Sequence, residues 1–80
     1  MAVKTRTIQV GSAEVAVDAS KQISEVVSDQ ARAAGYNTFW VFMEEAGKRR
    51  EVREGDVKGK SLSDIAENVK LVIEKFDEGG

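Results

Sequence analysis

At the middle of the chain lies the stretch SKQISEVVSDQARAAG, residues 20–35. Its apolar side chains recur at helical spacing, which predicts a helix over residues 21–34 with one narrow apolar face. The positions on this face are Ile23, Val26, Val27, Gln30, Ala31 and Ala34. Ser20 is a favourable N-cap, and Gly35 stands where a left-handed residue commonly ends a helix. The helix is therefore expected to begin after Ser20 and to end before Gly35.

Before this helix, apolar and polar residues alternate in two short runs, as they do in half-buried strands. Gly11-Ser12 separates the runs and offers a turn. The pattern predicts a β-hairpin whose apolar side chains share one buried face. These side chains are Ile8, Val10, Val15 and Val17.

After the helix, residues 38–44 form the strongest strand candidate, because they are dense in β-branched and aromatic residues. Glu44 shares the alternation of Trp40 and Phe42, which places that set on the outer face of a sheet. The inner set, predicted to face the core, is Phe39, Val41 and Met43.

The remaining residues alternate between polar connections and short strands. The predicted segments are a turn at 46–48, a short polar strand at 49–53, a glycine-containing loop at 54–60, a helical turn at 61–65 and a final strand at 69–74. We therefore expect one domain over residues 1–74 and a flexible C-terminal tail over residues 75–80.

This order of elements is two strands, one helix, two strands, a helical turn and a last strand. It predicts an α+β roll, with a mixed sheet of four to five strands packed on one helix. The same order is that of the β-grasp architecture.

The composition is that of one small domain. The 80 residues are 41% hydrophobic and 32% charged, which suits a compact fold. A net charge of −2 argues against a dedicated nucleic-acid binder. No apolar run approaches the roughly 18 residues of a membrane span, and the polar start is no signal peptide. We expect a cytoplasmic monomer that binds neither nucleic acid nor membrane.

Cysteine and histidine are both absent, which removes thiolate ligands and the commonest general base. The 14 acidic residues are spread along the chain and form no convincing catalytic pair. Residues 55–61, GDVKGKS, resemble a phosphate-binding loop but have three residues where that loop has four before Gly-Lys-Ser. We therefore expect no enzyme site, no metal site and no bound cofactor.

A basic cluster follows the aromatic pair Trp40 and Phe42. Its members are Lys48, Arg49, Arg50 and Arg53. Basic and aromatic side chains together are one pattern of nucleic-acid binding. Here glutamates interleave with the cluster and largely cancel its charge: Glu44, Glu45, Glu51 and Glu54. An edge strand protected by charge is the favoured interpretation.

Gly79 and Gly80 end the printed sequence and offer a definite chemistry. A terminal glycine carboxylate is sterically bare, and two residues without Cβ can thread a narrow enzyme channel. Such a carboxylate attacks the α-phosphate of ATP to form an acyl-adenylate, from which a thiol or sulfide displaces AMP. The alternative is a linker or a frayed end. Chemistry at a free carboxylate needs no side-chain nucleophile, which agrees with the missing cysteine and histidine.

Five segments carry a family resemblance: residues 14–23, 46–48, 59–65, 69–73 and 79–80. Ala46-Gly47-Lys48, the Leu62-Ser63-Asp64 stretch and the Gly-Gly tail resemble motifs of ubiquitin and of the small modifier proteins of archaea and bacteria. The resemblance covers most of the chain, with an insertion between residues 48 and 59. Asp77-Glu78 stand where ubiquitin has a basic residue, which implies a different activating enzyme.

The resemblance implies a β-grasp protein modifier that is activated at Gly80 by an ATP-dependent enzyme and conjugated to target lysines. Gly79 and Gly80 would then be the conjugation site, and Lys48 a chain-forming lysine. The activating enzyme, and not this chain, would bind ATP. The implied partners are that enzyme, downstream conjugation enzymes and the target proteins.

Two other functions stay open. The chain would be a sulfur carrier if Gly80 bears a thiocarboxylate that sulfur-transfer enzymes use. It would be a non-conjugated interaction domain if it acts through an outer-face patch of Trp40, Phe42 and Val72.

Overall fold

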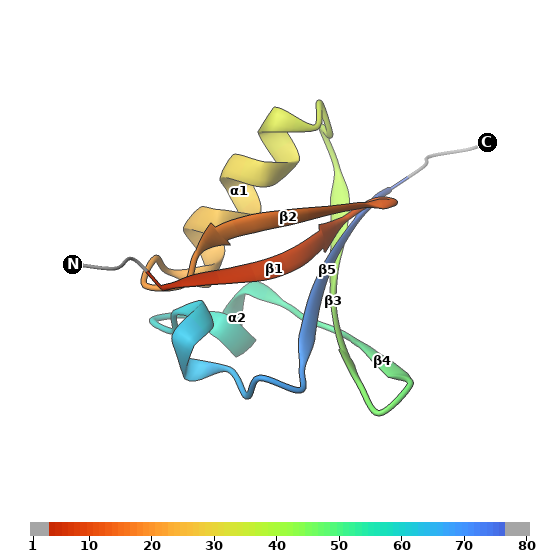
Figure 1. Cartoon of the computed structure of the whole chain (residues 1–80). Coiled ribbons are helices and arrows are strands. Elements are labelled where there is room, and N and C mark those ends of the chain that lie inside the picture. The colour runs from red at the N-terminus through yellow and green to blue at the C-terminus, as the bar shows by residue number, and fades with distance from the viewer. Residues whose placement is uncertain (1–3, 77–80) are drawn as a thin grey trace.

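The computed structural model describes residues 4–76, apart from the side chain of Glu54. It is a single sheet with one main helix on one face (Figure 1). In chain order the elements are β1 Thr5–Val10, β2 Ala13–Asp18, α1 Ile23–Ala33, β3 Phe39–Glu45, β4 Lys48–Glu51, α2 Glu54–Val57, a 3₁₀ helix at Leu62–Asp64 and β5 Lys70–Lys75.

The five strands lie in the order β2-β1-β5-β3-β4. β5 runs parallel to β1 and antiparallel to β3, and the two hairpins are antiparallel. The predicted α+β class, with a mixed sheet packed on one helix, is confirmed. The last strand is therefore the central one, and both halves of the sheet pair with it.

The first hairpin has the predicted buried face. Ile8, Val10 and Val17 are buried, and the half-buried Val15 packs against the same core. Gly11 in the turn has a φ of +62°, and a Cβ built there would lie 2.5 Å from the Tyr36 hydroxyl. Glycine is thus required at this turn for backbone conformation and for space.

Helix α1 ends as predicted but begins differently. Gly35 has a φ of +79°, and the amides of Gly35 and Tyr36 donate to Arg32 and Ala31 carbonyls, which makes a Schellman cap. The predicted N-cap Ser20 is wrong, because its hydroxyl donates to Asp18 at 2.6 Å. The helix starts at Ile23 instead.

The N-terminal end of α1 is held by a distant segment. The Ile23 amide donates to the Lys60 carbonyl at 2.9 Å, and Gln22 forms an isolated bridge with Ser61. The hydrogen bonds from the Ser20 hydroxyl and amide lower the pKa of Asp18 below its ordinary value. Tertiary contacts, and not a side-chain cap, therefore set where this helix begins.

The connection after β4 is helical where a loop was predicted over residues 54–60. The helix α2 has one turn, and Val57 at its end is 6% exposed and belongs to the core. The Asp56 carboxylate accepts a hydrogen bond from the Arg53 amide at 3.0 Å. Burial of one valine and this cap fold the segment into a turn of helix.

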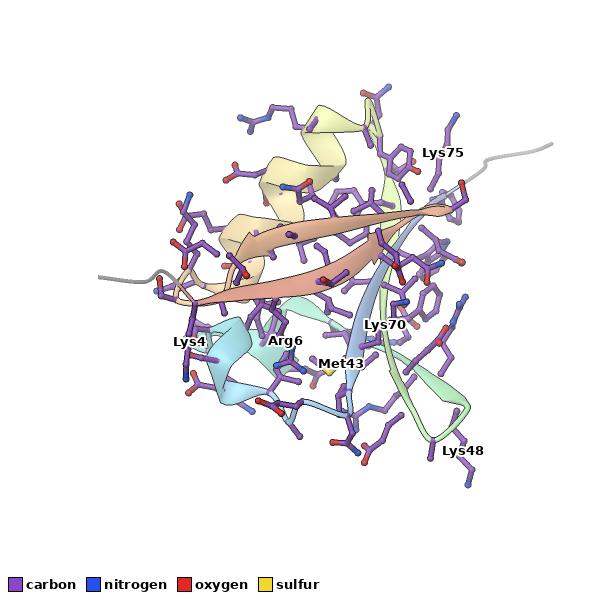
Figure 2. All side chains as sticks on the ribbon, in the orientation of Figure 1. Lys4, Arg6, Met43, Lys48, Lys70 and Lys75 are labelled. Carbon is purple, nitrogen blue, oxygen red and sulfur yellow. The ribbon has the colours of Figure 1, made fainter. Side chains whose placement is uncertain are left out.

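The predicted helical turn at 61–65 is confirmed as the 3₁₀ helix, which is fastened to β1 by one side chain. The Arg6 guanidinium donates to four backbone carbonyls of the segment leading into β5. They belong to Leu62, Ile65, Ala66 and Val69. Figure 2 shows Arg6 between β1 and this segment.

The final strand has the predicted length but lies one residue further along the chain. β5 extends through Lys75, and the Phe76 amide donates to the Thr38 carbonyl at 3.1 Å. The sheet therefore includes the first residue of the predicted 75–80 tail and fixes the second. Residues 77–80 lie outside the described part of the chain.

Candidate functional site

The outer face of the sheet, opposite α1, carries a pair of aromatic side chains from β3. Trp40 and Phe42 lie there, as their alternation along β3 predicted, with ring centroids 6.4 Å apart. Trp40 is 39% exposed, and it is the one large hydrophobic side chain classed as exposed among residues 4–76. The face thus offers an indole surface to solvent beside a half-buried phenyl ring.

A third ring completes this cluster from the end of β5. Phe76 meets Trp40 edge-on, with centroids 5.1 Å apart and ring planes at 65°. The backbone bond between Phe76 and Thr38 places the side chain on the face that Trp40 occupies. Sequence reasoning assigned Phe76 to the tail. The available signal was that Phe76 continues the alternation of Val72 and Glu74.

Val72 lies on this face but adds no accessible surface. It is 0% exposed, because it stands in register between Phe42 on β3 and Gln9 on β1. Its place in the predicted patch of Trp40, Phe42 and Val72 is therefore corrected. We use the name aromatic face for Trp40, Phe42 and Phe76.

Charged side chains at the aromatic face are paired. The Arg49 guanidinium lies 5.2 Å from the Phe42 ring centroid and donates to Glu44 at 2.8 Å and to Glu74 at 2.9 Å. These hydrogen bonds, from Glu44 first and then Glu74, raise the pKa of Arg49 above its ordinary value. Within the basic cluster, Arg49 is thus neutralised by Glu44, one of the predicted glutamates, and by Glu74, which was not among them.

Lys48, the predicted chain-forming lysine, lies at the tip of the β3–β4 hairpin. Ala46 and Gly47 both have positive φ, +53° and +80°, which is the geometry of a tight hairpin turn. Lys48 is exposed, and the ion pairs between described side chains do not include it. Figure 2 shows it at one end of the β3–β5 pair, with Lys75 at the other.

The aromatic cluster gives a spectroscopic prediction. Phe76→Ala removes the ring that meets Trp40, so we expect the tryptophan emission to shift to longer wavelength and the free energy of unfolding to fall by about 1 kcal/mol. Lys75→Ala, an exposed neighbour, is the control and should leave the emission maximum in place. An unchanged spectrum in Phe76→Ala would contradict the observed packing.

The predicted conjugation residues, Gly79 and Gly80, lie outside the described residues. Within residues 4–76, no three or more acidic side chains group as they would around a metal ion. Over the same residues, no helix has the length and apolar character needed to span a bilayer.

A scan against protein-family models, a search of curated proteins and a search of solved structures each found no match.

Proposed function

We propose that this chain is a ubiquitin-like protein modifier with a β-grasp fold, joined to its targets through Gly80. The observation that carries the proposal is the position of Gly79-Gly80 shortly after β5, the central strand of a mixed five-stranded sheet. The strand order and the single main helix are compatible with a β-grasp domain.

Two motifs of the family resemblance occupy corresponding structural positions. Ala46-Gly47-Lys48 spans the β3–β4 turn and the start of β4, and Leu62-Ser63-Asp64 forms the 3₁₀ helix that precedes β5. Both motifs therefore serve as connections whose backbone geometry the fold needs. This placement supports the proposed family.

The aromatic face is the proposed contact surface for the activating enzyme. Gly80 is four positions beyond Phe76, so the Gly80 Cα lies at most about 14 Å from that of Phe76. Any enzyme that holds Gly80 in its ATP site must therefore approach Phe76 and Trp40. The exposed indole and its paired charges suit a partner surface of this kind.

The proposed chemistry takes place at the Gly80 carboxylate. Its oxygen attacks the α-phosphate of ATP, which releases pyrophosphate and leaves an acyl-adenylate. An enzyme cysteine thiolate then displaces AMP to form a thioester, and the amine of a target lysine displaces that thiol to form an isopeptide bond. The exposed amine of Lys48 is the proposed acceptor for chain formation.

We expect deletion of Gly79-Gly80 to abolish every covalent adduct while leaving the thermal midpoint within about 2 °C, because neither residue belongs to the described sheet. The tagged chain is incubated with ATP in a lysate of the cells that produce it, and the products are separated under denaturing, reducing conditions. Bands of higher mass that survive thiols indicate isopeptide conjugation. Asp77→Ala, which retains both glycines, is the matched control.

Intact-mass measurement separates the alternatives. The proposal requires that the mature chain end at Gly80, whatever residues follow Gly80 in a precursor. A gain of about 16 Da from the exchange of oxygen for sulfur would replace the modifier by a sulfur carrier. Adducts that persist after the deletion would contradict conjugation through Gly80, and the absence of both adducts and mass gain would leave the non-conjugated interaction domain. The proposed location is the cytoplasm.

A further inference from the structure

Two adjoining cavities form a groove on the helix side of the sheet. The first, about 290 Å³, lies between α1, β3 and the β4–α2 connection. The second, about 350 Å³, lies at the C-terminal end of α1, and both are lined by Ser28 and Phe39. We call this surface the α1–β3 groove. Its apolar lining consists of Ile23, Val27, Phe39, Val41, Val52 and Val57.

One wall of the groove is an unpaired strand edge. The β3–β4 register ends at Phe42 opposite Glu51, and one further bond joins the Val52 amide to the Val41 carbonyl at 2.8 Å. The next positions of this register would set Phe39 opposite residue 54, where the chain has already entered α2. Figure 1 shows α2 turned away from the line of β4.

The backbone of Phe39 therefore faces this edge. Alternate residues of an antiparallel strand direct their N–H and C=O groups to the same side, so Phe39 shares the direction of the Val41 carbonyl. Among residues 4–76, no strand pairs with Phe39 on that side. A free donor and acceptor beside an apolar groove is the arrangement to which an extended peptide adds as a further strand.

The charged side chains that line the groove, among those the structure describes, are both arginines. Arg53 lines the first cavity and Arg32 the second. No carboxylate that the structure describes lines either cavity, although the whole chain has a net charge of −2. The ion pairs between described side chains include neither arginine. The ends of the groove thus favour carboxylates, while Ser24 and Ser28 offer hydroxyl groups between them.

We infer that the α1–β3 groove binds an extended segment of a partner protein that has apolar residues at its centre and acidic residues at both ends. The segment pairs with the Phe39 edge, places its apolar side chains on the groove lining, and directs its carboxylates to Arg32 and Arg53. The site lies on the helix side of the sheet, on the opposite side from the aromatic face. It operates whether or not the chain is conjugated.

The test uses the full ¹⁵N-labelled chain and the synthetic peptide acetyl-Asp-Glu-Val-Thr-Ile-Ser-Val-Glu-Asp-amide. We expect saturable binding with a dissociation constant below about 1 mM. The largest shift changes should be at the amides of Ser28, Phe39 and Val41, and hydrogen exchange at Phe39 should slow. The same peptide with lysine in place of its acidic residues should bind at least about tenfold more weakly.

Matched variants test the charge argument. Arg32→Gln combined with Arg53→Gln should weaken binding of the acidic peptide about tenfold or more. Arg50→Gln removes one positive charge from an exposed β4 residue that lines neither cavity, and it should change binding less than twofold. The ¹⁵N spectra of the free variants establish that each is folded.

Four results would overturn the inference. They are no saturable binding of the acidic peptide at about 1 mM, equal binding of the lysine peptide, shift changes confined to the aromatic face, and self-association of the free chain through the Phe39 edge. Because no activating enzyme or ATP is present, none of them bears on conjugation through Gly80.

Discussion

Arg6→Ala is expected to lower the free energy of unfolding by about 3 kcal/mol. The guanidinium donates to four carbonyls, at 2.6 Å to Leu62 and Ile65 and at 2.7 Å to Val69, with the fourth bond to Ala66. Hydrogen bonds from a charged donor are the stronger kind. Alanine would leave these carbonyls, three of them in partly buried bonds, without that donor and would release the segment between the 3₁₀ helix and β5.

The planar, forked guanidinium of arginine is what allows one side chain to reach all four carbonyls. A lysine ammonium is a single point and cannot reach four carbonyls spread over residues 62–69, so Arg6→Lys should recover less than half of the loss. Arg50→Ala, at an exposed position on β4, is the control and should stay within about 0.5 kcal/mol of the original chain. Urea titration followed by circular dichroism measures all three variants.

The loss of Arg6 should also be visible in the hydrogen exchange of the segment that it fastens. In Arg6→Ala the amides of residues 62–69 should exchange with solvent faster than the rest of the chain, because their segment loses its fastening to β1. A loss below about 1 kcal/mol would contradict the role given to Arg6. Equal stability of the alanine and lysine variants, both well below the original, would show that the fork and not the charge is what matters.

The parts of the fold that sequence predicted are those with a regular period. Ile8, Val10 and Val17 alternate with polar residues, and their burial followed from that alternation. The α1 apolar face and the glycine cap at Gly35 were likewise local signals. These features depend on neighbours within a few residues, and so a single sequence reveals them.

The features that sequence missed depend on distant partners. Ser20 has the chemistry of an N-cap, but Asp18 takes its hydroxyl and Lys60 holds the helix start instead. α2 forms because the core accepts Val57. The reach of Arg6 to residues 62–69 spans more than fifty positions of the chain, and no local pattern indicates it.

For the candidate site too, the sequence predicted the features that depend on local alternation and missed those that depend on strand order. Alternation along β3 correctly predicted that Trp40 and Phe42 face outward. Val72 is buried because β5 is the central strand. Its central position depends on strand order, which alternation does not reveal. The α1–β3 groove depends on where β4 ends, and strand ends are weakly encoded by local sequence. Gly79 and Gly80 remain predictions because they lie outside the described residues.

Ile73→Ala should cause the largest loss of stability, about 3–4 kcal/mol. The Ile73 side chain is 0% exposed and belongs to the core. In the sheet it stands between Val10 on β1 and Val41 on β3, and its carbonyl accepts the Gly11 amide at 2.7 Å. A cavity here removes contacts from both halves of the sheet at once.

Ile73→Val supplies the matched control, because it removes one methylene group and keeps the β-branched shape that suits a strand. We expect it to cost about 1 kcal/mol, so the two variants should fall on a graded scale of lost volume in a denaturant titration. A domain of this size has a total stability of roughly 4–12 kcal/mol, so the alanine variant should lose a large share of it. Equal effects of valine and alanine, or a loss below about 1 kcal/mol in Ile73→Ala, would mean that β5 does not occupy the centre of the sheet.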